Sequence, residues 1–211
     1  MSEPVQAVIL DYGGVICKLP EAEQTRQLAE LCGLSTEDFL TYFWQYRLAY
    51  DRADLDDRSY WHSIASSAGK SYSDEQIARF DECDVRFWLT LDEPMLEWNR
   101  TLRAAGFKTA ILSNMPASLG MHIRKHTDLF DQFDVVTLSY EVRSAKPEPE
   151  IYKSCLADLG LRGEQTLFFD DKLTNIRAAQ ALGIHAITYK SRAELNGQET
   201  AYGLPAVPLH G

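Results

Sequence analysis

The feature that most constrains this chain is a series of five short apolar runs, each bounded by polar, acidic or glycine residues. The runs occupy residues 7–10, 109–112, 135–138, 166–169 and 185–188. Short apolar runs of this length are typical of strands that are buried on both faces of a parallel sheet. Three helical patterns lie between them and each ends at a glycine, which is a helix stop signal with a steric cause. These patterns span residues 94–105, 147–159 and 174–182.

Strands that alternate with helices predict an α/β fold, a Rossmann-like parallel sheet with helices on both faces. In sheets of this kind, ligands bind beyond the carboxyl ends of the strands. We expect about five strands, with the first strand between the second and the fourth. This order would bring together the residues that follow these three strands.

Residues 17–90 interrupt the alternation, because they show helical patterns and no strand. This stretch is rich in aromatic residues, namely Phe39, Phe43, Trp44, Tyr46, Tyr50, Tyr60 and Trp61. Aromatic residues at helical spacing usually form a core, so most of them are expected to pack inside the insert. We therefore predict a core domain formed by residues 1–16 and 91–211, and an inserted helical cap domain formed by residues 17–90. A cap at this place would lie over the ligand site and could exclude water from it.

The charge balance excludes one large class of partners. The chain carries 21 basic and 31 acidic residues, a net charge of -10, which opposes binding to nucleic acid. No apolar stretch is long enough to span a membrane, and the N-terminus lacks the pattern of a signal peptide. Four widely spaced cysteines show neither zinc-site nor redox-motif spacing. These features predict a cytoplasmic protein with reduced thiols and no membrane partner.

Polar residues follow three of the predicted strands at the point where each strand ends. Asp11 follows the first strand and precedes Tyr12, Gly13 and Gly14, a sequence suited to a sharp turn around an anion. A tight turn with a capping aspartate is the alternative interpretation.

Asp170 and Asp171 follow the fourth strand as an adjacent pair of carboxylates. Two neighbouring carboxylates repel each other unless a cation lies nearby, and Mg²⁺ prefers oxygen ligands. A cap on the helix that begins near Thr174 is the alternative for this pair.

Lys146 directly precedes Pro147, with Glu148 and Glu150 expected in the first helical turn. A lysine fixed by the proline at the helix start could balance the acidic residues and hold a phosphoryl oxygen. Ser113 and Asn114, after the second strand, could bind another phosphoryl oxygen.

Four segments together resemble the haloacid dehalogenase (HAD) superfamily of hydrolases, in the subclass with a helical C1 cap after the first strand (subfamily IA-like). They are AVILDYGGV (7–15), ILSN (111–114), KPEPEIY (146–152) and FFDDKLTNIRAAQALGI (168–184). The resemblance covers nearly the whole chain, although the cap matches only in its position and helical character.

The resemblance implies a Mg²⁺-dependent phosphatase that hydrolyses a small phosphorylated metabolite. Asp11 would attack phosphorus to form an aspartyl-phosphate, which water would then hydrolyse. The residues implied to hold Mg²⁺ are Asp11, the Gly13 carbonyl and Asp171, with Asp170 in support. Ser113, Asn114 and Lys146 would bind the phosphoryl group, Lys146 would also take part in catalysis, and Asn175 would order the metal loop.

Two residues depart from the family pattern. The phosphatases usually carry a second aspartate, which acts as general acid and base, where this chain has Gly13. Without another acid, the rate should depend steeply on the leaving group. Arg143 stands where relatives often have glycine. The alternatives are a metal-independent 2-haloacid dehalogenase and a catalytically silent binding protein; the acidic pair argues against the dehalogenase.

The sequence leaves the substrate and the oligomeric state open. A sugar phosphate or a similar metabolite is the class expected from the resemblance. Candidates to line the cap side of the site are Arg47, Tyr50, Arg52 and His62, although each residue is more often an ordinary surface or packing residue.

Overall fold

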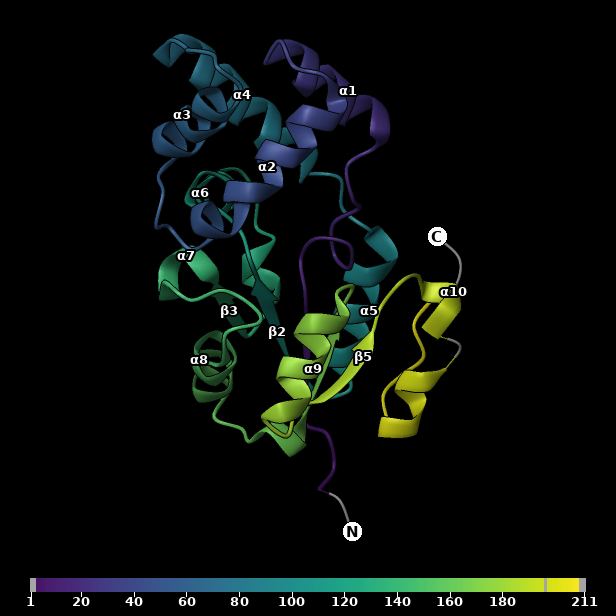
Figure 1. The fold of residues 1–211 in the computed structure, drawn as a ribbon. Coiled ribbons are helices and arrows are strands. Elements are labelled where there is room, and N and C mark those ends of the chain that lie inside the picture. The colour runs from purple at the N-terminus through teal and green to yellow at the C-terminus, as the bar shows by residue number, and fades with distance from the viewer. Residues whose placement is uncertain (1–2, 196, 209–211) are drawn as a thin grey trace.

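The computed structural model describes residues 3–195 and 197–208. A parallel sheet of five strands lies at its centre, in the order β3-β2-β1-β4-β5 (Figure 1). The strands are β1 (Ala7–Leu10), β2 (Lys108–Ser113), β3 (Val135–Leu138), β4 (Thr166–Asp170) and β5 (His185–Thr188). The predicted α/β fold is therefore confirmed, as is the place of the first strand between the second and the fourth.

Each strand supplies alternate residues to two apolar layers, because side chains along a strand point to opposite faces. Ala7 and Ile9 of β1 pack in one buried cluster, whereas Val8 and Leu10 pack in another. The first layer is covered by α8 (Pro149–Leu159) and α9 (Leu173–Ala181). The second is covered by α5 (Glu93–Ala104) and α6 (Ala117–His126).

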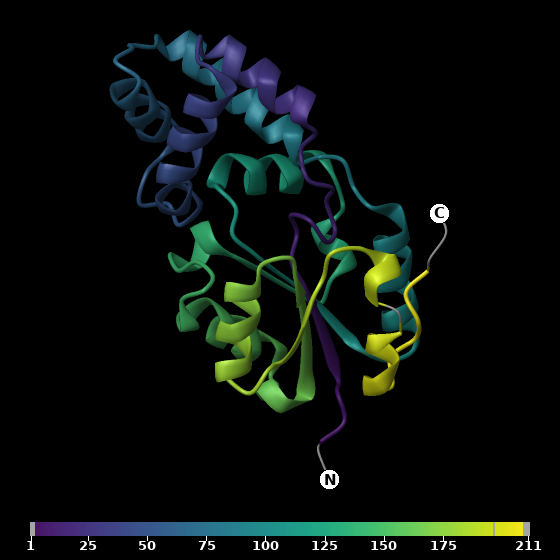
Figure 2. The same cartoon turned by 45° about the vertical axis from the view of Figure 1, so that its right-hand side comes forward.

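Short elements complete the core. They are α7 (Ser139–Val142), α10 (Arg192–Leu195) and the 3-10 helices η1 (Phe130–Gln132), η2 (Gly163–Gln165) and η3 (Gln198–Tyr202). The segment that contains α10 and η3 lies on the same side of the sheet as α5 (Figure 2). It is fixed there by Leu195 and Leu204 in the apolar layer and by the Trp98 Nε1–H, which donates to the Pro205 carbonyl at 2.8 Å.

Four helices lie between β1 and α5 and form a separate group above the carboxyl ends of the strands (Figures 1 and 2). They are α1 (Ala22–Leu31), α2 (Thr36–Asp51), α3 (Asp57–Ser67) and α4 (Asp74–Phe87). Three of them, α2, α3 and α4, begin with the side-chain caps that sequence rules favour, Ser35, Asp56 and Ser73. They enclose an apolar cluster of their own, centred on Tyr60 and Trp61. Trp44 is an exception among the aromatic residues, because half of it is exposed.

One predicted helix begins later than the sequence indicated. Helix α8 starts at Pro149, so Pro147 precedes it and Glu148 is its N-cap, in an extended conformation. The physical reason is the second proline: the ring of Pro149 disfavours a helical conformation at the residue before it.

Two predictions from composition can be compared with the structure. The four cysteines form no disulfide and three of them are buried. Among the described helices, none combines the length and the apolar character needed to cross a bilayer.

Candidate active site

The carboxyl ends of β1, β2 and β4 meet beneath the four helices, and a cavity of about 350 Å³ opens there. Its lining includes seven of the residues that the sequence singled out: Asp11, Gly13, Ser113, Asn114, Lys146, Asp171 and Asn175. Asp170 lies beneath them and is fully buried. The structure therefore brings all eight predicted residues to one place.

Lys146 is the centre of the polar contacts in this cavity. Its Nζ lies 2.8 Å from Asp11 Oδ1 and 2.7 Å from Asp170 Oδ2, and it donates to the Leu112 carbonyl at 2.8 Å. An ammonium has three N–H donors, so these three contacts use its donor capacity. Burial alone would lower the pKa of Lys146, but the carboxylates of Asp11 and Asp170 raise it overall. The lysine is thus held as a buried cation.

Asp11 lies at the end of β1 and is almost fully buried. Burial raises its pKa to about 7; the Lys146 ammonium opposes this rise and the neighbouring Asp170 adds to it. Its Oδ1 also accepts the Tyr12 N–H at 2.6 Å. These contacts fix the orientation of the Asp11 carboxylate at the floor of the cavity.

The two adjacent aspartates have different surroundings. Asp170 accepts hydrogen bonds from Lys146 Nζ, from the Lys172 N–H at 2.8 Å and from Asn175 Nδ2 at 3.0 Å. Burial alone would raise the pKa of Asp170, but Lys146 and the other donors lower it overall. Asp171 lines the cavity, and no other described residue donates a hydrogen bond to its carboxylate. Burial and the neighbouring Asp170 raise its pKa.

This arrangement could hold a metal ion. One carboxylate oxygen each from Asp11, Asp170 and Asp171 lie within 4.8 Å of one another. An all-oxygen set of this kind suits Mg²⁺, which keeps several water ligands and takes one or two carboxylates from the protein. Because its oxygens are already hydrogen-bonded, Asp170 fits a supporting role better than a direct ligand. Asp11 and Asp171 have more accessible oxygens.

The turn after β1 depends on its two glycines for different reasons. Gly14 has φ +78°, a conformation that glycine adopts at little cost, and a Cβ there would lie 3.2 Å from the Asp171 carboxylate. A Cβ at Gly13 would lie 3.2 Å from Cζ3 of the Trp88 ring. A side chain at position 13 would therefore crowd the aromatic ring of Trp88, the residue just after α4.

Asn114 connects β2 to the loop that carries Lys146. Its Oδ1 accepts the Lys146 N–H at 2.7 Å, and its Nδ2 donates to the Lys146 carbonyl at 2.9 Å. This reciprocal pair positions the lysine over the strand ends. The Asn114 side chain is thus engaged with the protein, whereas Ser113 lies beside it at the cavity wall with only a long contact of 3.4 Å to the Asn114 carbonyl.

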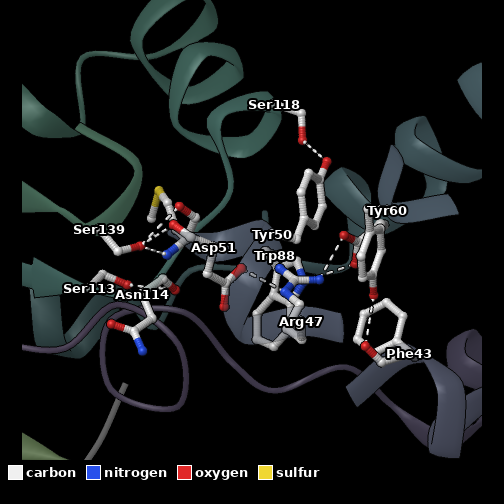
Figure 3. Close-up of polar contacts among 12 residues, drawn as sticks. Phe43, Arg47, Tyr50, Asp51, Tyr60, Trp88, Ser113, Asn114, Ser118 and Ser139 are labelled. Atoms are coloured by element: carbon white, nitrogen blue, oxygen red, sulfur yellow. Dashed lines mark hydrogen bonds and ion pairs between the residues drawn. The ribbon is translucent and has the colours of Figure 1, made fainter. Parts of the chain in front are cut away.

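Residues of α2 and α4 form a buried ionic network beside the cavity, part of which is drawn in Figure 3. Arg47 donates to Asp51 Oδ1 at 2.7 Å and to Asp84 Oδ2 at 2.8 Å. Asp84 also accepts the Trp88 Nε1–H at 3.2 Å. Asp51, at the end of α2, and Trp88, just after α4, line the cavity with Arg47. Sequence reasoning missed Asp51 and Trp88, because no local pattern marks them.

Of the four residues expected on the cap side, only Arg47 lines the cavity. Tyr50 instead joins Asp81 to Ser118, and Arg52 forms ion pairs with Asp54 and Glu148. His62 is exposed on α3, away from the cavity. For these three residues the structure agrees with the alternative interpretation, an ordinary surface or packing role. A helix presents only one face to the core, and the sequence does not show which face that is.

Arg143, the second departure from the family pattern, has φ +51°. This left-handed conformation is unfavourable for residues other than glycine, which explains why glycine suits the position. The Arg143 guanidinium donates to the Ala53 carbonyl at 3.2 Å and so joins the core to the loop after α2.

Comparison with known proteins gives matches to one family, both in sequence and in structure. The family model for haloacid dehalogenase-like hydrolases matches residues 5–183. A HAD family enzyme from Bacteroides thetaiotaomicron, solved as a magnesium complex, has a TM-score of 0.74 and 27% identity, over 89% of this chain and 94% of that chain. The same enzyme was also solved with magnesium and inorganic phosphate; there the TM-score is 0.71 and the identity 26%, over 87% of this chain and 93% of that chain.

Two curated proteins illustrate the range of relatives. A sesquiterpene phosphatase from Aspergillus oryzae is 27% identical over 185 residues, which are 87% of this chain and 89% of that protein. Acyl-CoA dehydrogenase family member 10 from the mouse is 36% identical over 113 residues. That match covers 52% of this chain and only 10% of the mouse protein.

Proposed function

Because the chain belongs to the haloacid dehalogenase-like hydrolases, we propose that it is a Mg²⁺-dependent phosphatase that forms an aspartyl-phosphate on Asp11. The observation that carries this proposal is the arrangement at the strand ends, where Asp11, Asp171 and the buried Lys146 share one cavity. The structural relative that holds magnesium and inorganic phosphate supports the same chemistry.

In this proposal each residue has a separate task. Asp11 attacks phosphorus through its carboxylate, and Lys146 keeps that carboxylate oriented and balances charge on the phosphoryl oxygens. Ser113 donates to another phosphoryl oxygen. Asn114 contributes by fixing the Lys146 loop. Asn175 donates a hydrogen bond to Asp170 and so orients the carboxylate that forms an ion pair with Lys146.

Asp11, the Gly13 carbonyl and Asp171 would hold Mg²⁺, with Asp170 in support. When bound, the ion supplies positive charge to the phosphoryl oxygens, which the acidic chain as a whole lacks.

We also propose that residues 17–90 form a cap domain on a core of residues 1–16 and 91–211. The separate apolar cluster of α1–α4 supports this division. The cavity wall that the cap and the segment 115–119 supply is mainly apolar, and it includes Leu19, Trp44, Trp88, Met115 and Leu119. A wall of this kind favours a phosphate ester with an apolar alcohol part over a sugar phosphate. The sesquiterpene phosphatase among the relatives agrees with that choice.

A panel of aryl, prenyl and hexose phosphates, each assayed with Mg²⁺ and with excess chelator, tests the proposal. We expect hydrolysis that requires Mg²⁺ and is faster for the apolar esters. Asp171→Ala should raise the Mg²⁺ concentration needed for half-maximal activity, because it removes a charged ligand. Full activity in chelator, or halide release from a 2-haloacid, would favour the dehalogenase alternative. A properly folded, Mg²⁺-binding chain that hydrolyses no ester would favour the silent binding protein.

A further inference from the structure

The position that carries the acid in related phosphatases is a glycine in this chain, and a side chain there would be crowded by Trp88. A Cβ at Gly13 would contact the Trp88 ring at 3.2 Å, and the Trp88 indole is fixed by its hydrogen bond to Asp84. Position 13 itself carries no acid, and another acidic residue at the cavity could supply a proton to the leaving group. This step rests on the proposed function, because it concerns the same phosphoryl transfer.

Three aspartates line the cavity within the part of the chain that the structure describes, Asp11, Asp51 and Asp171. Asp11 is the proposed nucleophile, and Asp171 is a proposed metal ligand. We propose that Asp51, which enters the cavity from the cap side, is the general acid and base that replaces the missing aspartate at position 13.

The backbone of Asp51 is held firmly above the core. The Ser139 Oγ–H donates to the Asp51 carbonyl at 2.5 Å, and the same Oγ accepts the Met115 N–H at 2.9 Å. Ser139 is fully buried. The last residue of α2 is thus fixed to the loop that follows Ser113 and Asn114. Figure 3 shows the Asp51 side chain between Arg47 and these core residues.

The side chain of Asp51 has one oxygen engaged and one available. Oδ1 accepts from Arg47 Nε at 2.7 Å, whereas no described residue donates to Oδ2. The side chain is one-tenth exposed, at a residue that lines the cavity. Oδ2 is therefore the oxygen that can exchange a proton with a bound ester or with water.

The charge balance around Arg47 favours a proton on Asp51. One guanidinium serves two buried carboxylates, and Asp84 has the Trp88 Nε1–H as a further donor. Burial raises the pKa of Asp51; Arg47 opposes the rise, Asp84 adds to it and Lys172 opposes it more weakly. A carboxyl that keeps its proton at a higher pH than usual is suited to act as an acid.

The proposed reaction has two steps, transfer of the phosphoryl group to Asp11 and its transfer from Asp11 to water. An oxygen of the Asp11 carboxylate bonds to phosphorus, the bond between phosphorus and the ester oxygen breaks, and that oxygen takes the Asp51 proton as it leaves with the electron pair. The Asp51 carboxylate then takes a proton from water as the water oxygen bonds to phosphorus. The phosphorus–Asp11 bond breaks, which releases inorganic phosphate and restores both aspartates.

The test compares Asp51→Asn with Asp84→Asn in single-turnover reactions with aryl phosphates of graded leaving-group pKa. Both substitutions remove one carboxylate from Arg47 and keep a side-chain oxygen as acceptor, but Asp84 does not line the cavity. A nitrophenolate can leave without being protonated, whereas an alkoxide-like leaving group must receive a proton as it departs. We expect Asp51→Asn to slow the poorest leaving group by about a hundredfold or more and the best hardly at all.

A shallow dependence on leaving group in the native protein and in Asp84→Asn, with a steep one in Asp51→Asn, is the expected result. With the poorest leaving group, the native rate should fall as pH rises through the Asp51 pKa, and Asp51→Asn should lack this fall. An equal slowing of every ester by Asp51→Asn would overturn the assignment, since it would mean a structural role. A native protein inactive on the whole series would instead contradict the proposed function itself.

Discussion

Lys146 is a buried cation whose ammonium contacts two carboxylates and one backbone carbonyl. Asp11 and Asp170 lie on two sides of its ammonium, and the Leu112 carbonyl completes its contacts. Removing one partner of a buried ion pair leaves a charge without solvent or counter-charge, which costs more free energy than the intact pair contributes. The site is therefore both a structural and a chemical unit. Substitutions at its two adjacent aspartates should separate these roles.

Asp170→Ala should destabilise the fold, whereas Asp171→Ala should not. The first variant removes one of the three acceptors of Lys146 and the acceptor of the Asn175 side-chain amide. The buried ammonium loses one of its two counter-charges, so we expect a loss of about 3–5 kcal/mol in the free energy of unfolding. The second removes a carboxylate that no described residue contacts through a hydrogen bond, so the loss should stay below about 1 kcal/mol. Urea unfolding without Mg²⁺ measures both. Equal losses would mean that Asp170 does not anchor the cluster.

Asp11→Asn should remove turnover and keep the fold. The amide oxygen can still accept the Tyr12 N–H, and Lys146 keeps its contacts to Asp170 and Leu112. An amide cannot form the aspartyl-phosphate, and loss of a covalent nucleophile costs on the order of 10⁶-fold in kcat. Steady-state kinetics and the unfolding midpoint check the two parts. Substantial residual turnover would exclude Asp11 as the nucleophile.

At the level of elements, the turn after β1 contacts the residue that follows α4. The Tyr12 hydroxyl donates to the Trp88 carbonyl at 2.5 Å, and the Trp88 ring fills the space beside Gly13. The guanidinium of Arg47 lies 5.7 Å from the centre of the same ring. Gly13, in the turn after β1, and Trp88, just after α4, therefore pack directly against each other.

Gly13→Asp should destabilise the native chain by about 1–3 kcal/mol, because the new side chain overpacks the Trp88 ring. The same substitution should cost less in a Trp88→Ala background, which opens the space. A double-mutant cycle from urea unfolding gives the coupling, with Gly13→Ala as the matched control for loss of glycine. Additive effects would show that Trp88 does not close this position.

Across the whole molecule, the parts that sequence could predict are those that local patterns determine. The five strands follow from apolar runs buried on both faces, and the site residues follow because parallel strands end at one edge. The short elements α7, α10 and η3 were missed, since their few residues lack a periodic pattern and are held by tertiary contacts such as Trp98 to Pro205. Asp51 and Trp88 were missed because their place at the cavity depends on how α1–α4 pack over the strand ends.

Covalent phosphorylation of Asp11 in the presence of Mg²⁺ can be measured directly. The native protein is mixed with an excess of an aryl phosphate, quenched in acid within one turnover and digested for peptide mass spectrometry, with and without chelator. We expect one phosphoryl group on the peptide that contains Asp11, formed only with Mg²⁺ and absent in Asp11→Asn. Product released without any phosphoryl-protein, or a phosphoryl group on another residue, would contradict it.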